Sequence, residues 1–203
     1  MYFKKVPSFF PKLFNKAIWQ LPSDNQVYLT FDDGPHPDST PHLLSLLDKL
    51  QIKAHFFCLG SHAELYPELI EDIIRRGHLV GHHGYKHLSG WKTSTSEYLE
   101  NIDKSKPYID STLFRPPYGR LSLNQYRHIS SLYTIIMWTI MPGDFEKSIS
   151  TVTILKNLKK YTEGGAIITL HDTVSAWEQN KAVIEDYDLY IKSLGMSFGI
   201  IEG

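Results

Sequence analysis

The sequence predicts a single α/β domain in which parallel strands form a sheet or barrel, and three observations support this fold class. Short apolar runs that suit buried strands alternate with runs whose apolar residues recur at helical spacing, as in a sheet covered by helices. Most of the strand-like runs end in polar residues, and parallel α/β folds gather their chemistry at these carboxyl ends. With 203 residues, 42% of them hydrophobic, the chain is long enough for one core.

Six short apolar runs are expected to form the strands. In chain order they span residues 27–31, 53–60, 78–83, 113–119, 134–140 and 165–172. The first run, VYLTF, is followed by Asp-Asp-Gly-Pro, four residue types that favour turns. The sequence therefore places Asp32 and Asp33 side by side where the first strand ends.

Four helices are expected among these strands. They span residues 41–50, 66–77, 94–109 and 150–161. Pro41 suits an early helical position behind Ser39 and Thr40 as caps, and Gly77 suits the end of the second helix.

The N-terminal residues 1–24 are interpreted as an amphipathic segment that precedes a single domain at residues 25–203. Residues 9–21 are expected to form a helix with Phe10 and Phe14 on one side and lysines nearby. We expect the apolar side to pack on the protein's own body, with peripheral membrane contact as the alternative. No run is apolar enough for a secretory signal or a membrane span, so a cytoplasmic or membrane-peripheral protein is expected.

The charge and cysteine content exclude some function classes. Lys and Arg total 21 against 22 Asp and Glu, so the chain lacks the basic field that nonspecific nucleic-acid binding requires. Nucleic acid is therefore not expected as a partner. The single cysteine, Cys58, lies among apolar residues and is expected to be a buried core residue rather than a nucleophile.

The segment GHLVGHHGYKH, residues 77–87, contains four histidines and indicates a metal site. His83 and His87 are four residues apart, which in a helical turn would place both imidazoles on one face. His78 and His82 share this spacing, so spacing alone does not choose between the pairs. The position of His83 and His87 after the apolar Leu-Val-Gly favours the second pair, and Asp33 could supply a third, hard ligand.

Three further polar residues follow later strand-like runs. Arg115, in FRPPYG, could hold one of the two adjacent carboxylates in its ionised form. His171, at the end of an apolar run, is placed to act as a general acid, and Asp144 could keep its imidazole protonated.

These residues occur in motifs that resemble those of the NodB-like polysaccharide deacetylases, carbohydrate esterase family 4. The motifs are TFDDGP, HGYKH, RPPYG, the Gly-Asp before Phe145, and LHD. They have the order and about the separations found in that family, from about Tyr28 to Asp172. The resemblance implies a deformed, incomplete (β/α) barrel with a divalent metal ion in a shallow groove on its carboxyl face.

The resemblance also implies a role for each matching residue. Asp33, His83 and His87 are the implied metal ligands, with Zn²⁺ as the expected ion and Co²⁺, Ni²⁺ or Mn²⁺ as alternatives. The implied catalytic residues are Asp32 as the base, Arg115 as its partner, His171 as the general acid and Asp144 as the residue that tunes it. The implied oxyanion and substrate contacts are the backbone N–H of Tyr118, Pro116, Thr169 and Leu170.

The expected function is a metal-dependent hydrolase that removes N-acetyl groups from sugars of a polysaccharide or oligosaccharide and releases acetate. Peptidoglycan, a chitin-like oligomer and a lipid-linked glycan all remain candidate substrates. An O-acetyl carbohydrate esterase with the same ion is one alternative. A sugar-binding module that has kept the groove and lost turnover is another.

Overall fold

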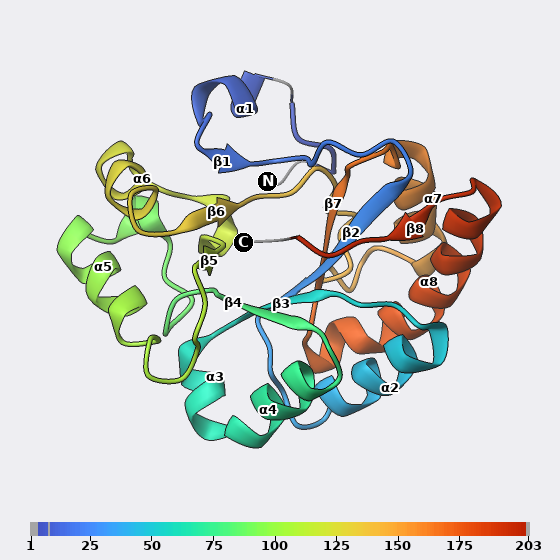
Figure 1. Ribbon diagram of the computed structural model, residues 1–203, viewed down its shortest axis with the longest axis horizontal. Coiled ribbons are helices and arrows are strands. Elements are labelled where there is room, and N and C mark those ends of the chain that lie inside the picture. The colour runs from blue at the N-terminus through green and yellow to red at the C-terminus, as the bar shows by residue number, and fades with distance from the viewer. Residues whose placement is uncertain (1–3, 8, 202–203) are drawn as a thin grey trace.

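A curled parallel sheet forms the centre of the computed structural model, which describes residues 4–7 and 9–201 (Figure 1). Its strands are β1 (Ala17–Ile18), β2 (Gln26–Asp32), β3 (His55–Cys58), β4 (Leu79–His82), β5 (Leu113–Phe114), β6 (Thr134–Ile136), β7 (Ile167–His171) and β8 (Ser197–Phe198). The spatial order is β1-β6-β5-β4-β3-β2-β7, and β8 pairs with the start of β2. All of these pairings are parallel. The six expected strands are all present.

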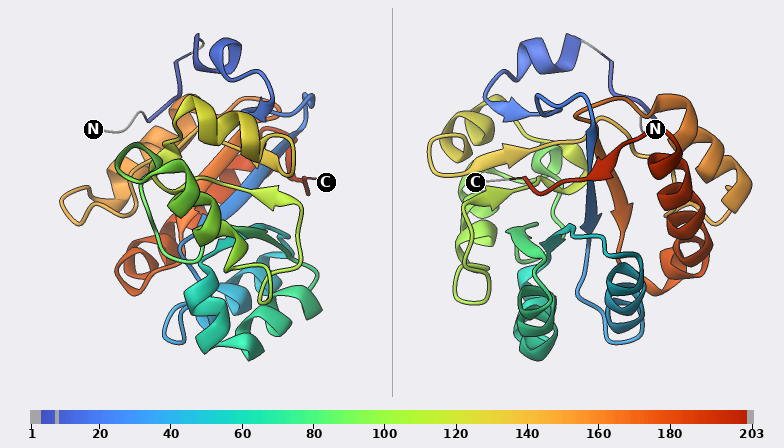
Figure 2. Two further views of the ribbon diagram at one scale, coloured as in Figure 1. Left: turned by 90° about the vertical axis from the view of Figure 1, so that its left-hand side faces the viewer. Right: turned by 45° about the vertical axis from the view of Figure 1, so that its right-hand side comes forward.

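Helices surround the outside of the curled sheet (Figures 1 and 2). They are α1 (Phe9–Leu13), α2 (Thr40–Leu50), α3 (Gly60–Leu65), α4 (Pro67–Arg75), α5 (Thr95–Asp103), α6 (Leu123–Ile129), α7 (Thr151–Tyr161) and α8 (Val174–Ser193). Two short 3₁₀ helices, η1 (Gly90–Lys92) and η2 (Pro117–Gly119), lie in the connections. The four expected helices are present, whereas α3, α6 and α8 were not predicted.

The barrel is incomplete between β6 and β7. Irregular backbone after β6 joins the two edges: Thr139 N–H donates to the Ile167 carbonyl at 2.8 Å, and Thr169 N–H donates to the Ile140 carbonyl at 2.9 Å. Only Ile140 and Ile168 form a parallel bridge there. The predicted fold class, a deformed and incomplete (β/α) barrel, is confirmed.

The two faces of each strand enter two different layers of the core. On β2, Val27, Leu29 and Phe31 pack with residues of the surrounding helices, whereas Tyr28 belongs to a second apolar cluster that includes Phe57. Because side chains alternate along a strand, Thr30 and Asp32 lie on the same face as Tyr28. This face of the sheet carries polar residues of the candidate active site.

The N-terminal segment departs from the single helix expected at residues 9–21. The helix α1 ends at Leu13, and β1 pairs with β6 instead, where Met137 N–H donates to the Ile18 carbonyl at 2.8 Å. The sheet edge supplies hydrogen bonds that override the helical pattern. Phe14 and Ile18 pack against the second core cluster.

Residues 1–3 and 8 of this segment lie outside the described residues, and the division at residue 24 stays a prediction. Within the described residues, no helix combines the length and the apolar character needed to cross a bilayer.

Gly165, in the turn before β7, provides a test of how the N-terminal segment joins the barrel. Its φ is +79°, and a Cβ there would lie 1.8 Å from the carbonyl oxygen of Leu21. We expect Gly165→Ala to lower the free energy of unfolding by at least about 2 kcal/mol, because a strained backbone and a backbone clash add. Urea unfolding of the purified protein measures this change.

Gly195→Ala is the matched control for this substitution. Gly195 has a φ of +70°, but nothing lies within 4 Å of its Cβ position. Gly195→Ala should lower the free energy of unfolding by about 1 kcal/mol, the cost of the left-handed backbone alone. Equal losses in the two variants would contradict the close approach of Leu21 to Gly165.

Candidate active site

Two adjacent carboxylates diverge at the carboxyl end of β2. Asp32 is the last residue of the strand, and Asp33 follows it with a φ of +77°. Aspartate tolerates this left-handed conformation better than most residues, because its short polar side chain can bond locally. The change of backbone direction leads Asp32 to Arg115 and Asp33 to His83 and His87.

Asp33, His83 and His87 form a cluster with the composition of a metal site. Their ligand atoms lie within 4.8 Å of one another. Asp33 Oδ1 is 3.5 Å from His83 Nε2 and 3.3 Å from His87 Nε2. The same Oδ1 is buried and accepts no hydrogen bond within the described residues. One carboxylate and two imidazoles around an unsatisfied oxygen fit a divalent cation such as zinc.

The surroundings of His83 favour metal binding through its Nε2 atom. Its Nδ1 lies 2.8 Å from the carbonyl oxygen of Arg115, which can only accept, so Nδ1 carries the proton and Nε2 presents a lone pair. Burial, only partly opposed by Asp33, lowers the pKa of His83 to about 3. Burial also lowers the pKa of His87. Both imidazoles are therefore neutral, as metal binding requires.

The structure resolves which histidine pair belongs to the cluster. His82 is buried on β4, and its Nδ1 lies 2.8 Å from Ser105 Oγ. The Nδ1 of His78 accepts a hydrogen bond from Ala54 N–H at 3.2 Å. These two histidines have structural partners elsewhere.

The expected helical turn between His83 and His87 is absent, and Asn101 of α5 fixes this segment instead. The two histidines lie in the loop after β4, where Gly84 has a φ of +78°. The side-chain amide of Asn101 accepts from Lys86 N–H at 2.8 Å and donates to the Lys86 carbonyl at 2.9 Å. Sequence reasoning missed Asn101, because nothing in its spacing links α5 to this loop.

Asp32 forms a fully buried ion pair with Arg115. Arg115 Nη1 donates to Asp32 Oδ1 at 2.7 Å and to Thr30 Oγ1 at 2.6 Å. Nε and Nη2 donate to the carbonyl oxygens of Ile136 and Met137, both at 3.1 Å. Burial lowers the pKa of Arg115, and Asp32 opposes this shift. The arrangement orients Asp32 through Oδ1, and its other oxygen remains available for proton exchange.

Two residues expected at the substrate do not reach the surface of the site. Thr169 is fully buried, with its Oγ1 3.2 Å from that of Thr30, so it supports the network below Arg115. Leu170 lies on the opposite face of β7, in the core cluster shared with Phe31. Side chains alternate along a strand, so Leu170 points away from the face that carries Asp32. The position of Leu170 in the core therefore contradicts the expected contact between Leu170 and the substrate.

His171 lies beside Asp32 and is held by Asp144. The two strands bring Asp32 and His171 together as neighbouring partners. His171 Nδ1 is 3.0 Å from Asp144 Oδ1, and the His171 backbone N–H donates to Asp144 Oδ2 at 2.7 Å. Burial alone would lower the pKa of His171, but the Asp144 carboxylate raises it to about 9. His171 is therefore a protonated imidazole near neutral pH.

Asn180 of α8 completes the support of Asp144. Its Nδ2 donates to Asp144 Oδ2 at 2.9 Å, and both residues are buried. Sequence reasoning missed Asn180 because α8 itself was not predicted. Thr173, which caps α8, and the apolar spacing of Val183, Ile184, Tyr187 and Ile191 were signals that could have identified this helix.

The RPPYG segment forms the opposite side of the site. Tyr118 lies in η2 with a φ of +60°, and its ring centroid is 4.3 Å from that of His87. The N–H groups of Gly119 and Arg120 donate to the carbonyls of Pro116 and Pro117. For the Tyr118 N–H, the described residues provide no acceptor. Tyr118 thus presents a backbone donor near the ligand candidate His87, and the buried Pro116 precedes it.

Asp172 anchors the turn that carries Asp33. Its carboxylate accepts hydrogen bonds from Ser39 Oγ at 2.7 Å and Thr40 Oγ1 at 2.5 Å. Burial raises the pKa of Asp172 to about 6, and these two bonds oppose the shift. A Cβ on Gly34 would lie 2.5 Å from Asp172 Oδ2, so only glycine fits at that position. Asp172 is a positioning residue that sequence reasoning did not assign.

The chain is similar to several known proteins over most of its length. It is 34% identical over 155 residues to the peptidoglycan-N-acetylglucosamine deacetylase of Bacillus cereus, covering 73% of this chain and 56% of that one, so it spans about half of that relative. The crystal structure of the Bc1960 peptidoglycan N-acetylglucosamine deacetylase superposes with a TM-score of 0.87 at 28% identity, over 96% of this chain and 94% of that one. The family 4 carbohydrate esterase from Streptomyces lividans has a TM-score of 0.77 at 25% identity, over 89% and 94%.

The family model described as polysaccharide deacetylase matches residues 20–133, which is more than half of the chain. That region contains Asp32, Asp33, His83, His87 and Arg115. The match and the likeness to solved structures agree with the resemblance seen in the motifs. The chain therefore belongs to the polysaccharide deacetylase family.

Proposed function

We propose that this protein is a metal-dependent hydrolase that removes N-acetyl groups from the sugars of a polysaccharide or oligosaccharide and releases acetate. The observation that carries the proposal is the divergence of the two aspartates, because it separates a ligand cluster around Asp33 from a paired carboxylate at Asp32. The names of the relatives, which include peptidoglycan and chitooligosaccharide deacetylases, support an N-acetylated glycan as the substrate.

Asp33, His83 and His87 would hold a divalent ion, with Zn²⁺ as the first candidate. When bound, such an ion supplies Lewis acidity that polarises the acetyl carbonyl and lowers the pKa of water. The neutral imidazoles and the unsatisfied Asp33 Oδ1 support this choice of ligands.

The remaining residues divide the proton transfers and the charge stabilisation between them. Asp32, oriented by Arg115, accepts a proton from the water that attacks the acetyl carbon. The backbone N–H of Tyr118 donates to the developing oxyanion. An amine is a poor leaving group unless it is protonated, and the imidazolium of His171 delivers that proton. Free amino sugar and acetate are the products.

An O-acetyl carbohydrate esterase is the second candidate, since a solved relative is a family 4 carbohydrate esterase in complex with acetate. An ester has an easier leaving group than an amide and depends less on protonation by His171. Acetate release from N-acetylglucosamine oligomers and from O-acetylated xylan, compared at equal acetyl concentration, distinguishes the two activities.

Metal removal tests the proposed function directly. Acetate release from N-acetylglucosamine oligomers should disappear after treatment with a chelator and return on addition of Zn²⁺. Asp33→Ala should weaken Zn²⁺ binding by more than about 100-fold, because it removes a direct ligand rather than a supporting contact. Calorimetric titration of metal-free protein measures the affinity independently of turnover.

His82→Asn is the control for the choice of ligands. His82 is bonded to Ser105, away from the ligand cluster, so its loss should leave the Zn²⁺ affinity unchanged in the folded protein. An intact affinity in Asp33→Ala, or a lost one in His82→Asn, would refute the ligand assignment.

Asp32→Asn tests the proposed base. Asparagine keeps an oxygen for Arg115 Nη1 but cannot take up a proton, so kcat should fall by about 10²–10⁴-fold. Zn²⁺ affinity and the urea midpoint show whether the metal site and the fold survive the substitution. A rate near that of the original protein would exclude Asp32 as the base.

Asp144→Asn tests the proposed acid through the pH dependence of kcat. The pKa of His171 is raised to about 9, so its proton is present at neutral pH and is lost as the pH rises through that value. Without the Asp144 charge, burial should lower this pKa, and the alkaline decline of kcat should move to lower pH. An unchanged alkaline limb in the folded variant would contradict the role of Asp144.

A further inference from the structure

An apolar pocket of about 390 Å³ adjoins the candidate active site. The N-terminal segment forms one wall, and the loop after β5 together with the region of η1 forms the other. Its apolar lining includes Leu13, Phe14, Trp19, Trp91, Met137 and Trp138.

The pocket meets the candidate active site at Tyr118. Pro116 and Tyr118 belong to its lining, and the Tyr118 ring is in contact with the ring of the metal-ligand candidate His87. When the acetyl group of a substrate lies at the ligand cluster, a neighbouring part of the same substrate can therefore reach this pocket.

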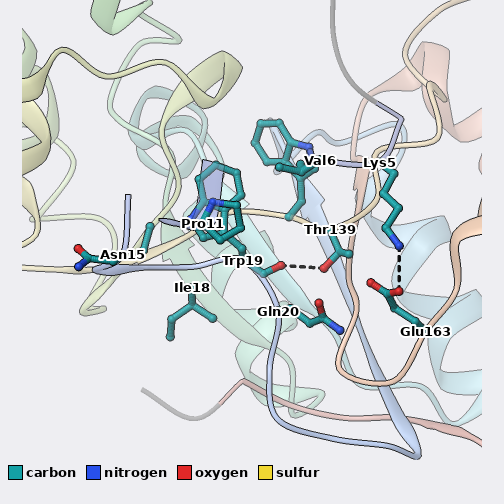
Figure 3. A pocket seen from close by; sticks show the side chains of 11 residues that line it. Lys5, Val6, Pro11, Asn15, Ile18, Trp19, Gln20, Thr139 and Glu163 are labelled. Carbon is teal, nitrogen blue, oxygen red and sulfur yellow. Dashed lines mark hydrogen bonds and ion pairs between the residues drawn. The ribbon is translucent and has the colours of Figure 1, made fainter. Parts of the chain in front are cut away.

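A second cavity, of about 560 Å³, lies beside the first and has a different character. Its lining mixes apolar side chains with polar ones such as Gln20 and Thr139, and it includes the Lys5–Glu163 ion pair of 2.8 Å (Figure 3). It shares Trp19 and Trp138 with the apolar pocket but does not include Tyr118. The apolar pocket is the one that adjoins the site.

The lining of the apolar pocket suits an aliphatic chain better than a sugar ring. Sugar hydroxyls need hydrogen-bond partners, and burying them against apolar side chains leaves them unsatisfied. At about 30 Å³ for each water-sized group, the pocket holds about a dozen methylene-sized groups. Each methylene group removed from water strengthens binding, so the affinity should grow with the length of the chain that the pocket holds.

Among the described residues that line the pocket, Arg120 is the one with a cationic side chain. Its guanidinium lies 5.0 Å from the ring centroid of Trp91 and 5.6 Å from that of Tyr118. No carboxylate pairs with Arg120 in the part of the chain that the structure describes. Arg120 thus lies in the pocket wall near Tyr118, where it can pair with an anionic linkage such as a phosphate.

We propose that this pocket binds the aliphatic chain of a lipid-linked sugar whose anionic linkage contacts Arg120. The proposal rests on the proposed deacetylase function and selects the lipid-linked glycan from its candidate substrates. The lipid chain lies against the N-terminal segment, the linkage lies at Arg120, and the sugar extends past Tyr118 toward the ligand cluster.

Tryptophan fluorescence measures occupation of the pocket directly. Three of the four tryptophans, Trp19, Trp91 and Trp138, line it, whereas Trp177 stacks on His42 elsewhere. Octyl phosphate and octyl glucoside, titrated below their micelle concentrations into the metal-free protein, should give saturable spectral changes. Octyl phosphate should bind more tightly, and an N-acetylglucosamine trimer without a chain should give no comparable change.

Leu13→Asp places a charge in the pocket at a side chain that is already 62% exposed, so the fold should tolerate it. It should weaken the binding of both octyl compounds by about tenfold or more, because the chain would have to desolvate a carboxylate. Leu132→Asp is the matched control, since Leu132 is 57% exposed and lines neither cavity. Arg120→Gln should abolish the preference for octyl phosphate while octyl glucoside binds as before.

Equal effects of Leu13→Asp and Leu132→Asp would overturn the proposal, as would binding of the trimer in place of the octyl compounds. An octyl phosphate no tighter than octyl glucoside would overturn the role of Arg120. Because the titration uses metal-free protein and no turnover, its outcome is independent of the acetate assay. The two experiments therefore distinguish a failure of the proposed pocket binding from a failure of the proposed deacetylase activity.

Discussion

The buried ion pair between Arg115 and Asp32 is the interaction on which the rest of the site depends. Arg115 is wholly inaccessible to solvent, and its guanidinium donates to Asp32, to Thr30 and to two carbonyls at the end of β6. A charge so deep in the protein is tolerated only with full pairing, and removing one partner typically costs about 3–5 kcal/mol. The contacts that join β2 and β6 across the barrel are therefore the same contacts that orient the proposed base. Arg115 therefore contributes both to the stability of the barrel and to the orientation of the proposed base.

The second constraint is the backbone at Asp33, because two neighbouring aspartates must serve two different partners. A regular strand would send them to opposite faces of the sheet, whereas the positive φ of Asp33 turns it toward His83 and His87 above the barrel. Such a conformation costs about 1–3 kcal/mol unless the surroundings impose it. Asp172 provides that support through Ser39 and Thr40, and its tight contact with Gly34 excludes any larger residue.

Periodicity and motifs in the sequence predicted six of the eight described strands, four of the helices and the residues of the ligand cluster, because the signals for these features are local. The parts that escaped prediction depend on contacts between distant segments. Asn101 and Asn180 each fix a site loop or side chain through one buried amide, and neither lies in a recognisable pattern. The expected helical turn at His83 failed because hydrogen bonds to Asn101 hold the loop instead. The wrong expectation for Leu170 was avoidable from the sequence alone. Side chains alternate along a strand, so Leu170 and His171 face opposite sides of the sheet.

The proposed pocket lies where the N-terminal segment meets the barrel. The family match begins at residue 20 and includes the proposed base and all three ligand candidates. The wall formed by Leu13, Phe14 and Trp19 precedes that match. It is attached to the barrel through β1 on β6 and through Leu21 on Gly165. Binding energy from remote parts of a substrate also positions its reacting group, so a wall beside the reaction centre can influence which substrate reacts. On this view, the barrel carries the proposed reaction centre, and the N-terminal wall contributes to binding of the part of the substrate that lies in the proposed pocket.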